Sequence, residues 1–210
     1  LFGKAHTVMA EGGIAAAMGN VNSHDNWQVH FRDTMRGGKF LNSWRMAELH
    51  AKEAPTRVWE LETYGALFDR TPDGKISQRN FGGHTYPRLA HVGDRTGLEM
   101  IRTLQQHAVH QGIEVFMECT ISRLLKDGDR ISGAVGYWRE NGRLMLFQAK
   151  AVVLATGGVG QLYAITTNPR VATADGWALA HGASAQLRDI EFLQFHPTAL
   201  FHPTARCGTS

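Results

Sequence analysis

Apolar residues in the first part of the chain recur at the spacing of an α-helix. Over residues 25–38, large apolar side chains fall four residues apart, at Trp27, Phe31 and Met35. Asp25 stands where a helix cap would stand, and Gly37 can stop the helix. The pattern therefore predicts one helix over this stretch.

Two further stretches also predict helices, with the glycine-rich loop 79–97 between them. Residues 43–65 predict two helical segments, because Pro55 interrupts the first and suits the opening turn of the second, which Gly65 ends. Residues 96–112 predict another helix, one side of which carries the apolar residues Leu98, Ile101, Leu104 and Ala108.

After residue 112 the period of the apolar residues changes to two, which is typical of strands. Residues 113–155 predict a strand, a β-meander with turns at 127–129 and 140–142, and a fully apolar, buried strand over 151–155. A short helix of small residues is predicted over 175–183. This order of helices, meander and buried strand favours the α/β class.

The composition is that of an ordinary globular protein, since 43% of the 210 residues are apolar and 20% are charged. The net charge is only +3 and the basic residues are dispersed, so no nucleic-acid partner is expected. Cys119 and Cys207 lack the spacing of a zinc site or a disulfide framework. We expect no metal site, and no apolar run approaches the ~20 residues of a membrane helix.

Two glycine-containing stretches could lie against a ligand. Thr156, Gly157 and Gly158 follow the predicted apolar strand, and open α/β sheets bind ligands at the carboxyl ends of their strands. The plain alternative is a tight turn after a core strand. Near the start of the chain, Gly12 and Gly13 permit close backbone approach, although an alanine-rich packing helix explains the same residues.

Two histidines are candidates for chemistry. His196 precedes Pro197, which favours an extended backbone at residue 196, and with Thr198 nearby its imidazole could bind a carboxylate. His6, taken alone, is typical of a surface histidine.

Six motifs together resemble the flavoprotein subunit of succinate dehydrogenase and fumarate reductase, with L-aspartate oxidase as a near relative. They follow the family's order over nearly the whole chain: HTVMAEGGIAAAMGN, DNWQVHFRDTMRGGKFLN, QRNFGGHTYPRLAHVGDRTG, KAVVLATGG, TTNPRVATADGWALA and EFLQFHPTAL. Residues 4 to about 154 resemble the actinobacterial type of succinate dehydrogenase, whereas GQLYAITTNP and FHPTALFHPTAR are more similar to L-aspartate oxidase. The fold implied is a partial Rossmann-like FAD-binding domain with a β-meander.

The resemblance implies FAD as the cofactor, attached covalently through the imidazole of His6. It also assigns nine further residues to the flavin site: Thr7, Ala10, Glu11, Gly12, Gly13, Thr156, Gly157, Gly158 and Asp175. Asp175 matches the aspartate of a TGDG motif, but this chain reads TADG, with Ala174 in place of the glycine. His196 matches the family histidine that binds a carboxylate of the dicarboxylate substrate.

The activity implied is the interconversion of succinate and fumarate, by hydride transfer to FAD. The resemblance further implies an iron–sulfur subunit that takes the electrons, and membrane-anchor subunits that hold the enzyme to the cytoplasmic face of the bacterial membrane. Two alternatives stay open. One is an L-aspartate oxidase, which holds FAD without a covalent link, and the other is a non-catalytic FAD-domain fragment.

Family members begin with a strand and a G-x-G-x-x-G phosphate loop ahead of the HTV motif, and the arginine that exchanges a proton with the substrate follows the last motif found here. We therefore expect an interior fragment that lacks the first strand and the phosphate loop. Residues 1–196 would be an incomplete FAD-binding domain, and residues 197–210 the start of the connection into a capping domain. The catalytic arginine would lie beyond the chain end, and the 210 residues alone would be inactive.

Overall fold

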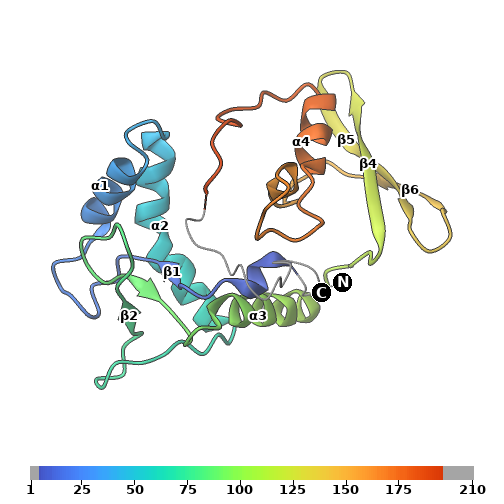
Figure 1. Cartoon of the computed structure of the whole chain (residues 1–210). Coiled ribbons are helices and arrows are strands. Elements are labelled where there is room, and N and C mark those ends of the chain that lie inside the picture. Colours follow the sequence, from blue (N-terminus) through green and yellow to red (C-terminus); the bar gives the residue numbers. More distant parts are fainter. Residues whose placement is uncertain (1–4, 196–210) are drawn as a thin grey trace. The chain divides into compact units, whose positions relative to one another are not determined.

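The computed structural model describes residues 5–195 of the chain. The chain divides into two compact units between Val115 and Phe116 (Figure 1). Each unit combines helices with a small three-stranded antiparallel sheet, so the α/β class is confirmed in its broad form.

The first unit contains a short 3-10 helix and three α-helices: η1 His6–Met9, α1 Trp27–Gly37, α2 Trp44–Thr63 and α3 Thr96–His110. The helix predicted over 25–38 is confirmed as α1, but the predicted cap is wrong. The side chain of Asn26 caps α1, accepting hydrogen bonds from the backbone N of Gln28 at 3.0 Å and of Val29 at 3.1 Å. Asp25 is instead buried in an ion pair with Arg88.

Helix α2 runs without a break through Pro55, so the prediction of two separate segments is wrong. A proline inside a helix removes one hydrogen bond to the residue four positions earlier, here the carbonyl of Ala51. A stripe of buried residues continues on both sides of the proline: Ala47, Ala51, Ala54, Val58 and Leu61. Burial of this face against the core keeps the two halves in one helix, because packing supplies most of a helix's stability.

The core of the first unit lies between α2 and a small sheet. The strands are β1 Ile14–Ala15, β2 Gln78–Arg79 and β3 Leu89–Ala90, in the order β1-β3-β2. Eight buried apolar residues form the core cluster: Ala16, Ala54, Val58, Leu61, Ala66, Phe68, Ile76 and Ala90. Because β2 and β3 pair antiparallel, residues 80–88 form the loop of a hairpin, which we call loop 80–88.

Helix α3 is confirmed, but its predicted apolar side does not face the core. Leu98 and Leu104 are exposed, whereas Gly97 and Thr103 are buried. A β-carbon built on Gly97 would lie 1.8 Å from the carbonyl oxygen of Thr7. The small residues therefore face inward because η1 packs directly on the first turn of α3.

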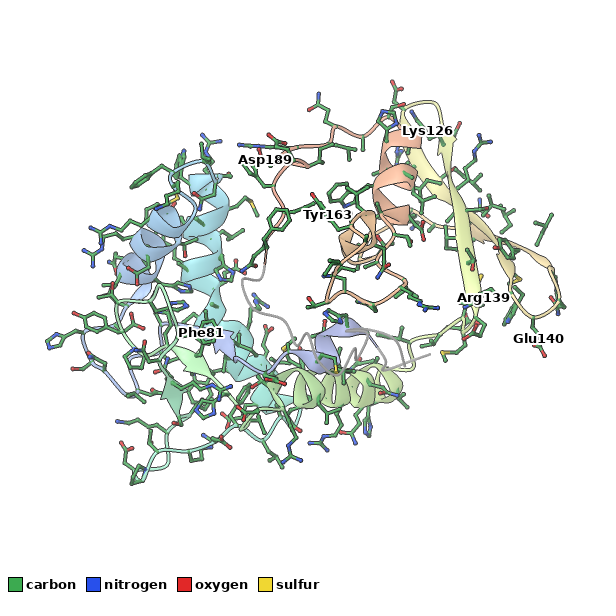
Figure 2. All side chains as sticks on the ribbon, viewed as in Figure 1. Phe81, Lys126, Arg139, Glu140, Tyr163 and Asp189 are labelled. Atoms are coloured by element: carbon green, nitrogen blue, oxygen red, sulfur yellow. The ribbon has the colours of Figure 1, made fainter. Side chains whose placement is uncertain are left out.

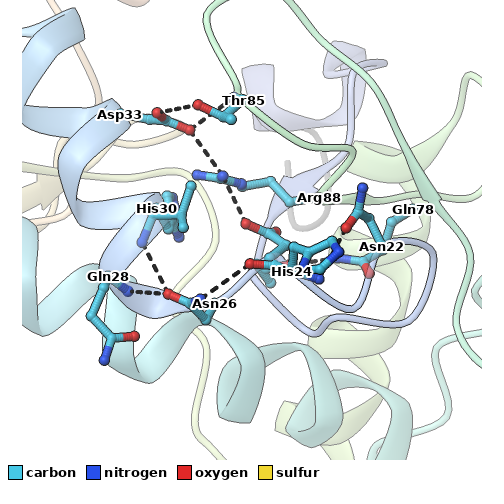
Figure 3. A network of polar contacts seen from close by, with 12 residues as sticks. Asn22, His24, Asn26, Gln28, His30, Asp33, Gln78, Thr85 and Arg88 are labelled. Atoms are coloured by element: carbon cyan, nitrogen blue, oxygen red, sulfur yellow. Dashed lines mark hydrogen bonds and ion pairs between the residues drawn. The ribbon is translucent and has the colours of Figure 1, made fainter.

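Arg88 is fully buried at the end of loop 80–88, between two carboxylates (Figure 3). Its Nη2 lies 2.8 Å from Oδ1 of Asp25 and 2.9 Å from Oδ2 of Asp33. The Asp33 carboxylate also accepts two hydrogen bonds from Thr85, one from the backbone N at 2.9 Å and one from the hydroxyl at 2.7 Å. The carbonyl of Arg88 accepts a hydrogen bond from Ala16 at 2.9 Å, which joins this network to the core.

Burial sets the protonation of the groups around Arg88. Burial raises the pKa of Asp25 above its ordinary value, against the opposing effect of Arg88. Burial also acts to raise the pKa of Asp33, but the hydrogen bonds from Thr85 and the charge of Arg88 outweigh it, so that this pKa is lowered. Burial and the Arg88 charge lower the pKa of His30 to about 4 and lower that of His84 as well.

The second unit contains the predicted β-meander. Its strands are β4 Cys119–Asp127, β5 Arg130–Trp138 and β6 Leu144–Gln148, and they pair antiparallel in the order β4-β5-β6. The turns lie at the predicted positions, with Gly128 and Gly142 both at positive φ. A short 3-10 helix, η2 Gly160–Leu162, follows, and the predicted short helix is confirmed as α4 Asp175–Gly182.

The buried strand predicted over residues 151–155 is not formed. This segment has no strand pairing, and the side chain of Val153 is 88% exposed. A central strand needs neighbours that accept and donate backbone hydrogen bonds, and within residues 5–195 no strand lies alongside it. The described residues accordingly contain only antiparallel sheets.

Helix α4 begins from a strained residue. Ala174, at the N-cap, has φ 68° and ψ 16°, which is the left-handed region that disfavours a β-carbon. The sequence TADG thus places alanine at the position where the related TGDG motif has glycine. Two contacts accompany this geometry: the Thr173 hydroxyl donates to Oδ2 of Asp175 at 3.0 Å, and Gly176 packs against Thr156.

We expect His30 to make the first unit less stable in acid. Between about pH 6.5 and its folded pKa of about 4, His30 takes up a proton in the unfolded chain but not in the folded chain, so stability falls as pH falls. The full shift corresponds to about 3 kcal/mol. Urea unfolding of His30→Gln at neutral pH and at about pH 4.5 should show a weaker pH dependence than the unsubstituted chain. His110→Gln, an exposed control on α3, should retain the original dependence. Equal slopes for the unsubstituted chain and His30→Gln would contradict the prediction.

We expect Ala174→Gly to stabilise α4. Glycine relieves the left-handed strain, and after its greater flexibility in the unfolded chain is subtracted the gain is about 1 kcal/mol. Amide exchange over residues 175–182 should slow roughly fivefold, measured by hydrogen-exchange mass spectrometry. Ala178→Gly, inside the same helix, should have the opposite effect because glycine destabilises helix interiors. Faster exchange in both variants would count against strain at Ala174.

Candidate functional site

Six of the predicted site residues lie in the first unit, on the segment from η1 to β1. The first turn of α3 holds this segment, since the backbone N of Gly97 donates to the carbonyl of Ala10 at 2.8 Å. The close approach of Gly97 to Thr7 leaves no room for a side chain between them. His6 is exposed at the start of η1. The segment is therefore fixed through its backbone, and the imidazole of His6 is accessible.

The next three residues, Glu11 to Gly13, are held by Arg79 from strand β2. The Nε of Arg79 donates to the carbonyl of Gly12 at 2.7 Å, Nη2 donates to the carbonyl of Glu11, and Nη1 pairs with Asp94 at 2.9 Å. Gly13 has φ 123°, and a β-carbon there would lie 2.8 Å from the carbonyl oxygen of Ala90 in β3. One guanidinium and one strand thus set the path of this backbone.

An open pocket of about 370 Å³ lies beside this segment. Its lining comprises Glu11, Gly12, Arg79, Asn80, Phe81 and Asp94. Phe81, labelled in Figure 2, is 58% exposed, and its Cε2 would lie 3.7 Å from a β-carbon built on Gly12. The pocket therefore combines backbone of the predicted flavin segment with an exposed aromatic ring and a partly buried cation.

The sequence interpretation missed Arg79, Phe81 and Asp94. All three lie in the stretch QRNFGGHTYPRLAHVGDRTG, which was interpreted only as a glycine-rich loop and a family motif. An arginine two residues before an aromatic residue and a glycine pair was the available signal. Its meaning depends on the β2–β3 pairing, which two-residue strands do not reveal in a sequence.

The other predicted flavin contacts lie in the second unit. A β-carbon on Gly176 would lie 1.8 Å from Oγ1 of Thr156, so Thr156 lies against the first turn of α4, next to Asp175. Gly157 has φ 80°, and nothing lies within 4 Å of where its β-carbon would be. Gly158 approaches only the side chain of Asn168, at 4.0 Å. The structure thus brings Thr156 and Asp175 together and leaves the glycine turn uncovered.

The remaining candidate, His196, lies outside the described residues. Among residues 5–195, no group of three or more histidine, cysteine, aspartate or glutamate side chains is arranged to hold a metal ion. In the same part of the chain, none of the helices combines the length and apolar character that crossing a membrane requires.

The sequence matches the FAD binding domain family over residues 2–208. It is 45% identical over 202 residues to a protein of the fumarate reductase (CoM/CoB) of Methanothermobacter marburgensis, a match that covers 96% of this chain and 37% of that protein. It is 39% identical over 206 residues to the succinate dehydrogenase flavoprotein subunit of Rickettsia bellii, covering 94% of this chain and 34% of that protein. The chain thus spans about a third of the length of these relatives.

Solved structures agree with the sequence relatives. The Sdh1 complex of Mycobacterium smegmatis is 66% identical and superposes with a TM-score of 0.83, over 87% of this chain and 33% of that chain. A quinol fumarate reductase of E. coli is 36% identical, with a TM-score of 0.80 over 85% of this chain and 30% of that chain. The chain therefore belongs to the FAD binding domain family and, within it, to the flavoproteins of succinate dehydrogenase and fumarate reductase.

Proposed function

We propose that this chain is the FAD-binding part of a flavoprotein subunit that interconverts succinate and fumarate. The observation that carries the proposal is the arrangement around Arg79, which holds the carbonyls of Glu11 and Gly12 beside an open pocket. This is the segment that the family resemblance assigns to the flavin. The relatives named fumarate reductase and succinate dehydrogenase support the same activity.

The residues of the first unit fit a flavin. Gly12 presents backbone beside Phe81, and no side chain of its own fills the space between the segment and the ring. Arg79 is 31% exposed at its side chain and donates to the backbone that faces the pocket. We propose that Thr7, Ala10 and Glu11 to Gly13 line the flavin and that His6, exposed at the start of η1, forms the covalent link.

The residues of the second unit fit a nucleotide. Gly157 and Gly158 expose backbone that no side chain covers, and Asp175 stands at the start of α4 with its carboxylate held by Thr173. Backbone amides and a carboxylate are groups that bind the phosphate and ribose of dinucleotides. We propose that these residues contact FAD in the complete flavoprotein. There, residues 151–155 would pair as a strand of a Rossmann-like sheet.

FAD, when bound, supplies the redox chemistry by accepting a hydride equivalent from the dicarboxylate. The residues of this chain would bind and orient. Arg79 fixes the flavin segment, Phe81 covers the pocket side of Gly12 with an apolar ring that displaces water, and His196 binds a substrate carboxylate. The complete enzyme would supply the proton-transfer arginine, the membrane-anchor subunits and the iron–sulfur subunit.

The covalent link can be tested by grafting. Residues 5–195 would replace the matching segment of the Mycobacterium smegmatis Sdh1 flavoprotein. Acid-precipitated chimera should then carry fluorescent flavin on a denaturing gel. His6→Ser should abolish that fluorescence and leave FAD bound non-covalently. It should also reduce succinate oxidation more than fumarate reduction, because losing the link lowers the flavin potential.

The control for this experiment is His110→Ser, an exposed histidine on α3, which should keep the fluorescent band. A chimera with His6 intact that releases all flavin in acid would refute the covalent link. If aspartate rather than succinate then reduces the flavin, the function is that of an L-aspartate oxidase.

Arg79 should contribute to flavin affinity. In the His6→Ser chimera, where FAD binds reversibly, Arg79→Lys removes the forked contacts to the carbonyls of Glu11 and Gly12. The FAD dissociation constant should rise roughly tenfold, measured by quenching of flavin fluorescence. Arg57→Lys, which alters an exposed ion pair on α2, is the matched control and should leave the constant unchanged. An Arg79→Lys chimera that binds FAD as tightly as its parent would contradict the role of Arg79.

A further inference from the structure

Loop 80–88 carries Phe81 but has few attachments of its own. Two of its hydrogen bonds are local: Phe81 N donates to Oδ1 of Asn80 at 3.0 Å, and His84 N donates to the carbonyl of Phe81 at 3.3 Å. Gly82 and Gly83 separate these two contacts. Local contacts of this kind close a turn but do not fix where the turn lies.

The long-range attachment of the loop is made mainly by Asp33. Both carboxylate oxygens of Asp33 accept from Thr85, at 2.9 Å and 2.7 Å, and Oδ2 also pairs with Nη2 of Arg88 at 2.9 Å. Asp33 is 8% exposed and belongs to α1, which the cap at Asn26 and the packing on α2 hold in place (Figure 3). A buried carboxylate on a fixed helix thus holds the second half of the loop.

The hold on Thr85 extends to Phe81 through the turn. Thr85 follows His84, and His84 N is bonded to the carbonyl of Phe81, so the anchor lies one residue beyond the closed turn. The Phe81 ring in turn lies in van der Waals range of Gly12. A continuous set of contacts therefore runs from Asp33 in α1 to the backbone beside the pocket.

We propose that Asp33 is a positioning residue, which fixes loop 80–88 through Thr85 and Arg88 and so holds the Phe81 ring against Gly12. The positioning is a property of the chain without ligand, and its value for flavin or substrate binding rests on the function proposed above. Asp33 touches neither the pocket nor the predicted flavin segment directly, so its effect is exerted through the loop.

Two variants of different severity test this. Thr85→Val removes only the hydroxyl bond to Asp33, and Asp33→Asn removes the charge that faces Arg88. The control is Thr71→Val, which breaks a similar hydroxyl–carboxylate bond to Asp73 in an exposed turn. Hydrogen-exchange mass spectrometry of the 210-residue chain should show roughly tenfold faster exchange over residues 80–88 in Thr85→Val, and a larger increase in Asp33→Asn. Exchange over α2 should not change in Thr85→Val, and Thr71→Val should leave loop 80–88 as it was.

A spectroscopic readout follows the Phe81 ring itself. In chain labelled with ¹³C,¹⁵N-glycine, the Hα signals of Gly12 carry the ring-current shift of Phe81, and Phe81→Leu gives their position without the ring. Thr85→Val and Asp33→Asn should move the signals toward that position.

Two results would overturn the proposal. One is an unchanged Gly12 signal in both variants. The other is exchange that rises equally over α2 and the loop in Thr85→Val, because that would mean general destabilisation. Neither readout uses flavin, so a failure of the proposed function would leave this test intact.

Discussion

A fully buried guanidinium, that of Arg88, imposes the constraint on which the first unit depends. A buried charge is costly unless it is paired, and Asp25 and Asp33 supply the pairing from two separate segments. Within residues 5–195, Nε and Nη1 of Arg88 have no hydrogen-bond partner, so the two carboxylates carry the whole compensation. Breaking such a pair typically costs about 3–5 kcal/mol, a large part of a domain's total stability of about 5–15 kcal/mol. The paths of α1 and β3 are therefore not independent of each other.

The elements that the sequence predicted well are those that local pattern determines. Helices α1, α3 and α4 and the meander have apolar periods and turn glycines within their own residues. The errors concern partners far along the chain. Asp25 has the chemistry of a cap, but its carboxylate pairs with Arg88, 63 residues away, which leaves the cap to Asn26. Residues 151–155 have the composition of a central strand, yet a strand forms only where neighbouring strands pair with it.

The candidate site was predictable to the extent that a contiguous motif carries it. The segment Glu11 to Gly13 and the turn Thr156 to Gly158 were found from family motifs, and the structure leaves their backbone uncovered at Gly12 and Gly157. Arg79 was not found, because its role comes from hydrogen bonds to carbonyls 67 and 68 residues earlier in the chain. The side chains that hold a binding segment in place are specified by the fold, and only the segment itself is specified by its sequence.

The Arg88 network also sets the order in which the first unit can fold during synthesis. Thr85 and Arg88 leave the ribosome 52 or more residues after Asp33 and Asp25, the partners they must meet. Helix α1 can form early from local contacts, but docking it without Arg88 would bury two carboxylates unpaired. The nascent chain should therefore keep α1 hydrated until the β2–β3 hairpin has emerged. The first unit then closes as one cooperative step, with no stable intermediate built from its N-terminal half alone.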